Sequence, residues 1–146
     1  MKWWSESLVS ILAAWLVAQV IKAVLAQNKS KTHKSLLVSG GMPSKHSAAV
    51  TAAAMSSALT EGVDSSLFAV STTLAVIVMY DAMNVRRAVG QNRAAILKLY
   101  DQLKNAEDIK EDDPLRDFES LGHTPTEVIV GAAIGILVAF VINLLT

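Results

Sequence analysis

Cysteine is absent from this 146-residue chain, which excludes disulfides and thiolate-bound metals. The formal net charge is zero, so the bulk positive charge that attracts nucleic acid is lacking, and no nucleic-acid partner is expected. Aromatic residues make up only 5% of the chain, yet Trp3 and Trp4 stand together at one end of the first apolar block, as in membrane-interface belts. The length suits a single domain, residues 1–146.

Hydrophobic residues are abundant, at 52%, and they gather in four blocks. Three blocks reach the roughly 20 residues that cross a bilayer, and the shorter second block consists of small residues that let membrane helices pack closely. We therefore predict an all-α integral membrane helical bundle of about four transmembrane segments. A compact soluble all-α domain is the alternative. The blocks are Leu8–Ala26, Ser47–Leu59, Ser66–Met83 and Val128–Leu145.

The first block has a second interpretation, as a cleaved signal peptide. Val24-Leu25-Ala26 resembles a small-residue cleavage site. However, Glu6 near its start and Lys22 inside the apolar run are not typical of a signal peptide. We therefore expect this helix to be retained.

The polar region after the third block is expected to contain one more helix. Arg86 and Arg87 close the third helix in this interpretation, and residues 91–106 form an amphipathic cytoplasmic helix that lies on the membrane or on the bundle. Its apolar face would hold Ile96, Tyr100 and Leu103. Residues 28–39 and 107–117 are expected to be linker and loop.

Loop charges predict the topology. With four crossings, nearly all cations fall on one side of the membrane, whereas the opposite side keeps Lys2 with three acids. The positive-inside rule then predicts a multi-pass protein of the cell membrane with both termini outside and both basic loops in the cytoplasm. The cations on the cytoplasmic side are Lys29, Lys31, Lys34, Lys45, Arg86, Arg87, Arg93, Lys98, Lys104, Lys110 and Arg116.

Two glycine turns on that cytoplasmic side each open a helix beside a histidine. The first is Gly40-Gly41-Met42-Pro43-Ser44-Lys45-His46, and the second is Gly122-His123-Thr124-Pro125-Thr126-Glu127. Glycine turns at helix N-termini aim free N–H groups at one point and bind anions. Each histidine taken singly is more often an ordinary capping or surface residue. Because there are two such turns, we predict that they come together around a phosphate.

Several charged side chains have both a structural and a chemical interpretation. Glu127 completes a capping box that begins at Thr124, but it also lies one helical turn from His123, whose imidazole it could orient. Lys22 is either an interfacial anchor or a cation that faces a partner or a phosphate. Asp81 is interpreted as an ion-pair partner of Lys22 or an arginine. Arg86 and Arg87 suit both topology and phosphate recognition.

Three stretches, residues 40–48, 80–87 and 121–128, resemble the signature motifs of the divergent PAP2 family. That family comprises membrane proteins related to type 2 phosphatidic acid phosphatases and vanadium haloperoxidases. The likeness covers nearly the whole chain. Pro43-Ser44-Lys45-His46 resembles the P-S-G-H motif of the wider superfamily, with Lys45 in place of glycine, and His123-x3-Glu127 resembles the end of its S-R-x5-H-x3-D motif.

The resemblance implies a phosphatase that passes through a phosphohistidine. By this likeness His123 would be the nucleophile, Glu127 would orient it, and His46 would protonate the leaving oxygen. Ser44 with nearby N–H groups, Gly41 among them, would hold phosphate oxygens. The K-x6-R-P motif of the superfamily is absent, and Asp117 stands where an arginine is usual, so Lys22, Arg86 and Arg87 would supply the phosphate-binding cations.

The expected function is therefore hydrolysis of a phosphomonoester or pyrophosphate, on a lipid, at the cytoplasmic face. No metal or other cofactor is expected, because cationic side chains and helix termini can stabilise the transition-state charge. The alternative is a non-catalytic membrane protein of the same fold that binds an anionic headgroup or a protein partner. A transporter is a weaker third hypothesis, because four spans leave little room for inverted repeats unless a homo-oligomer supplies them.

Overall fold

The computed structural model describes residues 3–27, 41–107 and 122–146, and in these ranges it contains α-helices and no strand. The predicted linker 28–39 lies outside the described residues, as does the predicted loop 107–117 except for Glu107. The helices are α1 (Trp3–Gln27), α2 (Lys45–Glu61), α3 (Ser66–Met83), α4 (Val85–Glu107) and α5 (Pro125–Leu145).

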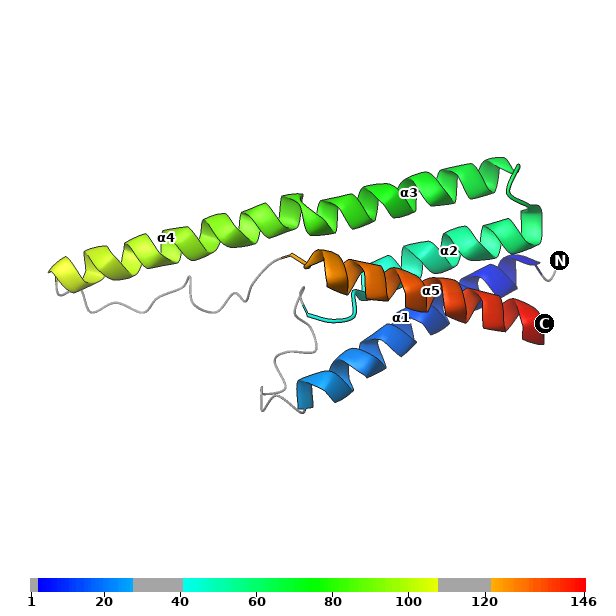
Figure 1. The fold of residues 1–146 in the computed structure, drawn as a ribbon, viewed down its shortest axis with the longest axis horizontal. Helices are drawn as coiled ribbons and strands as arrows, with labels where there is room; N and C mark the ends of the chain where they lie inside the picture. Colours follow the sequence, from blue (N-terminus) through cyan, green and yellow to red (C-terminus); the bar gives the residue numbers. More distant parts are fainter. Residues whose placement is uncertain (1–2, 28–40, 108–121) are drawn as a thin grey trace.

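Helix α2 lies at the centre of the bundle. It packs against α1, α3 and α5, while α1 also contacts α5 (Figure 1). Side-chain hydroxyls begin the helices on either side of the α2–α3 turn, because Ser44 accepts from the Ser47 N–H and Ser65 from the Phe68 N–H. Gly62 ends α2 with φ +88°, a conformation that favours glycine.

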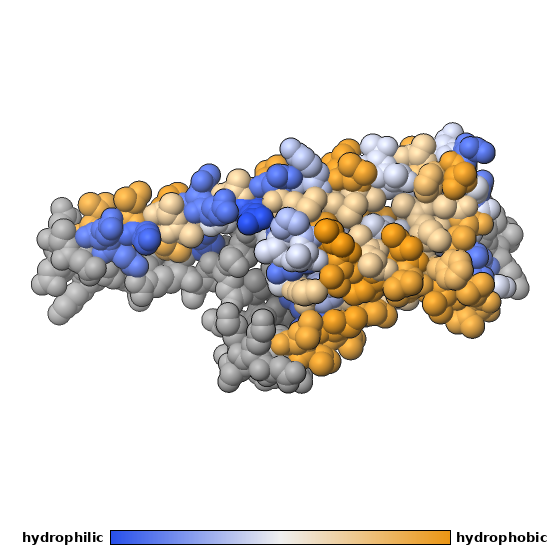
Figure 2. All heavy atoms as spheres, in the orientation of Figure 1, coloured by the Kyte–Doolittle hydropathy of each residue, from blue (hydrophilic) through white to orange (hydrophobic). Residues whose placement is uncertain are grey.

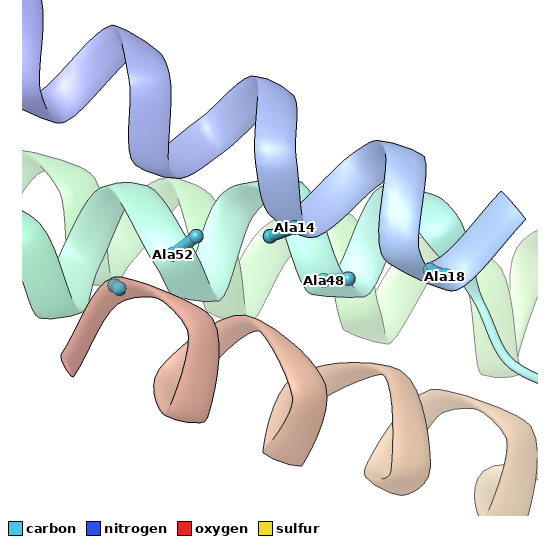
Figure 3. Close-up of a cluster of buried hydrophobic side chains, with 5 residues drawn as sticks. Ala14, Ala18, Ala48 and Ala52 are labelled. Carbon is cyan, nitrogen blue, oxygen red and sulfur yellow. The ribbon is translucent and has the colours of Figure 1, made fainter. Parts of the chain in front are cut away.

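The central cluster of the core consists of alanines. Ala14 and Ala18 of α1 lie against Ala48 and Ala52 of α2, and all four are fully buried (Figure 3). Ala139 of α5 completes this cluster. Helices with methyl side chains at their contacts approach closely, which is how membrane helices gain packing energy when lipid leaves no hydrophobic drive between them.

Two glycines allow α5 to lie directly on α2. A Cβ at Gly131 would collide with the backbone of Ser44, and one at Gly135 with Ala48 and Thr51. The Thr51 hydroxyl also donates across this contact to the Ala132 carbonyl, at 3.1 Å. The small-xxx-small pair of the last apolar block is therefore the α2–α5 contact.

We expect Gly131→Ala to destabilise the protein, because the added methyl group must push α5 away from Ser44. Overpacking of this kind costs about 1–3 kcal/mol. The measurement is the thermal unfolding midpoint of the purified protein in detergent. Ala133→Val is the matched control, because Ala133 is exposed on the same helix. Equal midpoints for both variants would contradict the close α2–α5 contact.

The outer surface of the bundle is apolar. Large hydrophobic side chains such as Leu12, Val70 and Leu137 are more than half exposed, whereas serines and small residues lie inside. Figure 2 shows hydrophobic colour over the bundle and hydrophilic residues gathered along α4 and its junction with the bundle. Within the described residues, three helical stretches are long and apolar enough to cross a membrane, namely Glu6–Leu25, Ser66–Leu103 and Pro125–Leu145. The predicted all-α membrane bundle is confirmed.

The polar helix differs from its prediction in where it begins and what it contacts. Helix α4 begins at Val85, so Arg86 and Arg87 open it instead of closing α3. The reason is local, because residues 85–90 contain no proline and the single Gly90 costs too little, about 1 kcal/mol, to stop a helix. Among the described helices α4 contacts α3 alone and continues its line (Figure 1), so it does not lie on the bundle.

Candidate functional site

The first glycine turn lies against a buried lysine of α1. Gly41 has φ +87°, and a Cβ there would lie 3.5 Å from Cε of Lys22. The Lys22 side chain is only 6% exposed. A cation from the first helix is therefore placed beside the turn that opens α2, as the phosphate hypothesis requires.

Ser44 ties this turn to α5. Its N–H donates to the Glu127 carbonyl at 3.0 Å, and its hydroxyl oxygen accepts from the Ser47 hydroxyl at 2.9 Å. Ser44 is fully buried. The bond to the Glu127 carbonyl holds the start of α2 against the start of α5, so the two predicted turns meet. A direct contact between Ser44 and phosphate stays a prediction.

In the second turn, one carboxylate oxygen holds both the helix cap and a histidine. Oε2 of Glu127 accepts from the Thr124 N–H at 3.1 Å and lies 3.0 Å from Nδ1 of His123. Thr124 accepts in return from the Glu127 N–H, which completes the capping box. The structural and chemical interpretations of Glu127 are thus not exclusive. Since the carboxylate is acceptor-only, Nδ1 carries the proton and Nε2 is the basic nitrogen.

The end of α3 fixes the position of this second turn. The His123 N–H donates to the Ala82 carbonyl at 3.1 Å. Gly122, with φ +101°, rests on the backbone of Arg86 and Arg87 so closely that a Cβ would collide with it. The α3–α4 junction therefore places Arg86 and His123 side by side.

A cavity of about 250 Å³ opens between these elements. His46, Arg86 and His123 supply its polar groups. Its other walls are aliphatic and come from α2 and α3. They are Ala49, Val50, Val78 and Ala82.

Arg86 carries an acidic partner at the cavity. Nε of Arg86 lies 2.6 Å from Oδ2 of Asp81, so the interpretation of Asp81 as the ion-pair partner of an arginine is confirmed. This contact uses Nε and leaves the two terminal NH₂ groups of the guanidinium to other acceptors. Arg87 is exposed and is not among the residues that line the cavity.

His46 faces several cations. Partial burial of its ring lowers the pKa of His46 below the usual value, and the positive charges of Lys45, Arg86 and Lys22 lower it further. Lys45 itself lies over the ring of Trp15, 5.4 Å from the centroid, and so is held toward α1. In the free protein His46 is therefore a neutral imidazole at pH 7.

Sequence comparison identifies the family. The profile of the divergent PAP2 family matches residues 4–138, nearly the whole chain. The chain belongs to the divergent PAP2 family. It is also 45% identical over 145 residues to the protein named "Uncharacterized membrane protein YuiD" from Bacillus subtilis (strain 168), a match that covers 92% of each chain. No solved structure matches it.

In this divergent PAP2 protein the cavity has an aliphatic wall that was not predicted from the sequence. Val78, Ala82 and Arg86 are spaced by four residues, so they lie on one face of the continuous α3–α4 line. Ala49 and Val50 follow His46 by three and four residues, which places them on its face of α2. These spacings were a usable signal, but only once His46 and Arg86 were known to share a cavity.

We expect Lys22→Gln and Arg86→Gln each to weaken vanadate binding. A charge-assisted contact is worth about 1.5–3 kcal/mol, or roughly 10- to 150-fold in Kd. Titration of the purified protein with vanadate measures this change. Arg87→Gln is the matched control for Arg86→Gln, because it removes the same charge at an exposed position one residue outside the cavity lining and should bind as wild type does. Wild-type affinity in the two test variants would mean that Lys22 and Arg86 contribute only to membrane topology.

Proposed function

We propose that this protein is a membrane phosphatase that hydrolyses a lipid phosphomonoester or pyrophosphate through a phosphohistidine on His123. The single observation that supports it most is the contact of His123 Nδ1 with Glu127 Oε2 at 3.0 Å, on the wall of a cavity that His46 and Arg86 also line. A carboxylate at one imidazole nitrogen raises the nucleophilicity of the other. The family and the membrane helices are consistent with this activity.

The reaction has two steps. Nε2 of His123 attacks phosphorus, the bond from phosphorus to the leaving oxygen breaks, and an imidazolium form of His46 gives its proton to that oxygen. Water then attacks the phosphorus of the phosphohistidine, the P–N bond breaks, and His46 takes the proton that the water loses. Inorganic phosphate leaves, and both histidines return to their starting forms. Arg86 and Lys22 stabilise the charge on the phosphoryl oxygens.

The cavity favours an amphiphilic substrate. Its polar groups are at the helix ends, whereas Ala49, Val50, Val78 and Ala82 provide an apolar wall between α2 and α3. A volume of about 250 Å³ holds a phosphate with the first part of a single hydrocarbon chain. The apolar outer surfaces of α2 and α3 would let the rest of that chain remain in the bilayer.

The direct test is trapping of the intermediate. Purified protein mixed with single-chain lipid phosphates or pyrophosphates and quenched in base should gain the mass of one phosphoryl group, and acid should remove it. Protein that binds these lipids without a phosphoenzyme or phosphate release would instead support the non-catalytic alternative. The test uses the full chain in detergent or nanodiscs.

We also expect phosphate binding to take up a proton at His46. The pKa of His46 is lowered in the free site, so the ring is neutral at pH 7, and a bound phosphate raises that pKa by adding negative charge. Binding should therefore take up as much as about one proton, and affinity should fall as pH rises. Calorimetric titration with inorganic phosphate in buffers of different ionisation enthalpy measures this uptake. His46→Gln should remove it, and the same uptake in that variant would contradict the assignment.

A further inference from the structure

Helix α4 extends out of the membrane-spanning bundle. The stretch Ser66–Leu103 is 38 residues long. At 1.5 Å per residue it measures roughly 57 Å, nearly twice the approximately 30 Å hydrocarbon core of a bilayer. Figure 1 shows α4 continuing the line of α3 away from the other helices. If α3 crosses the membrane, α4 therefore stands above its surface and cannot lie flat on it.

One side of α4 carries a heptad seam, with residues spaced alternately by four and three. The five apolar residues of this seam are between 49% and 66% exposed, and no other described helix except α3 touches α4. A spacing of 3.5 residues is typical of a helix that pairs with another helix, because it keeps one stripe facing the partner. The α4 seam consists of Val85, Val89, Asn92, Ile96, Leu99 and Leu103.

The residue types in the seam favour a parallel coiled coil of two helices. In this register Val89, Ile96 and Leu103 occupy a positions, whereas Val85, Asn92 and Leu99 occupy d positions. β-branched residues at a with leucine at d favour two-stranded coils, and Val89, Ile96 and Leu99 follow that pattern. Asn92 is the single polar residue of the seam.

A second copy of this chain, inserted in the same membrane, is the partner that matches the α4 seam. Copies inserted in the same orientation carry α4 at the same height and in the same direction, so their seams meet in register about a two-fold axis. The flanking positions allow this arrangement. In a parallel pair Arg93 would lie opposite Ala88 of the other copy, and Tyr100 opposite its Ala95, so like charges do not meet there.

We propose that two copies of this protein pair through the α4 seam in a parallel, two-stranded coiled coil, which stands in the aqueous phase outside the bilayer. Because α4 begins at the candidate site with Arg86, this pair holds the entrances of two sites next to each other. The dimer does not depend on the proposed phosphatase activity, and the two hypotheses can fail separately.

Disulfide crosslinking in membranes tests the dimer, and the absence of native cysteine makes single replacements unambiguous. Leu99→Cys should give an oxidant-dependent band at twice the chain mass, at least about tenfold stronger than Lys98→Cys, which places the thiol outside the seam. Asn92→Cys is a second seam variant, in case Leu99→Cys does not insert. A seam variant that inserts without crosslinking to itself would overturn the proposal. Equal crosslinking at position 98, or a product with a different protein, would overturn it as well.

Discussion

A His123→Ala protein is expected to lose turnover of every lipid phosphate and to form no phosphoenzyme. The change removes the nucleophile, whereas Arg86, Lys22 and the glycine turns remain, so phosphate and vanadate should still bind. Loss of a covalent nucleophile costs as much as about 10⁶-fold in kcat, and we expect a loss of at least roughly 10³-fold. Phosphate release and intact mass measured on the same sample check both effects.

Two controls make this result specific. His33→Ala changes the one histidine of the sequence that has no part in the proposed mechanism, and it should leave turnover unchanged. His46→Ala should slow turnover most for substrates with poor leaving groups, because its role is to protonate them. A fully active His123→Ala protein would exclude the mechanism. A wild type that binds phosphate but never hydrolyses a lipid phosphate would support the non-catalytic alternative instead.

The parts of this structure that follow from local chemistry were predictable from sequence. Block lengths predicted α1, α3 and α5, and Thr124, Pro125 and Glu127 predicted where α5 begins. The meeting of the two turns was expected because the chain has two similar glycine turns and both fell on one side of the predicted membrane. Ser44 and Glu127 make that contact through a backbone hydrogen bond, which has no sequence signal.

The continuation of α3 into α4 and the choice of arginine at the cavity depend on long-range packing, which the sequence does not reveal. The continuation of α3 into α4 was missed because Arg86 and Arg87 resemble a cationic helix end, although nothing in residues 85–90 stops a helix. The contact of His123 with the Ala82 carbonyl places Arg86 at the cavity and leaves Arg87 outside its lining. Adjacent arginines point in different directions on a helix, and only the packing of the turn on the junction selects between them.

Glu127→Gln is expected to lower turnover steeply while leaving the fold unchanged. The structure makes this substitution unusually selective, because a single oxygen of Glu127 accepts from the Thr124 N–H and contacts His123 Nδ1. The carbonyl oxygen of glutamine can make both contacts from the same position, and glutamine serves in a capping box as well as glutamate does. What the variant loses is the negative charge.

That charge matters only if His123 becomes positive during the reaction. When Nε2 binds phosphorus, the ring acquires positive charge, and a carboxylate at Nδ1 stabilises it, whereas a neutral amide does not. Replacing the carboxylate of a catalytic triad by an amide costs about 10⁴-fold in kcat. We therefore expect a fall of between about 10²- and 10⁴-fold, with helix content and thermal midpoint within error of wild type.

Thr124→Ala is the complementary control. It removes the hydroxyl that caps α5 and should cost about 1 kcal/mol of stability, but it leaves the Glu127 charge at His123 and should preserve most turnover. Thermal unfolding and steady-state turnover of both variants separate the two roles of this turn. If Glu127→Gln turns over as wild type does, Glu127 acts only as a helix cap and does not activate His123 as a nucleophile.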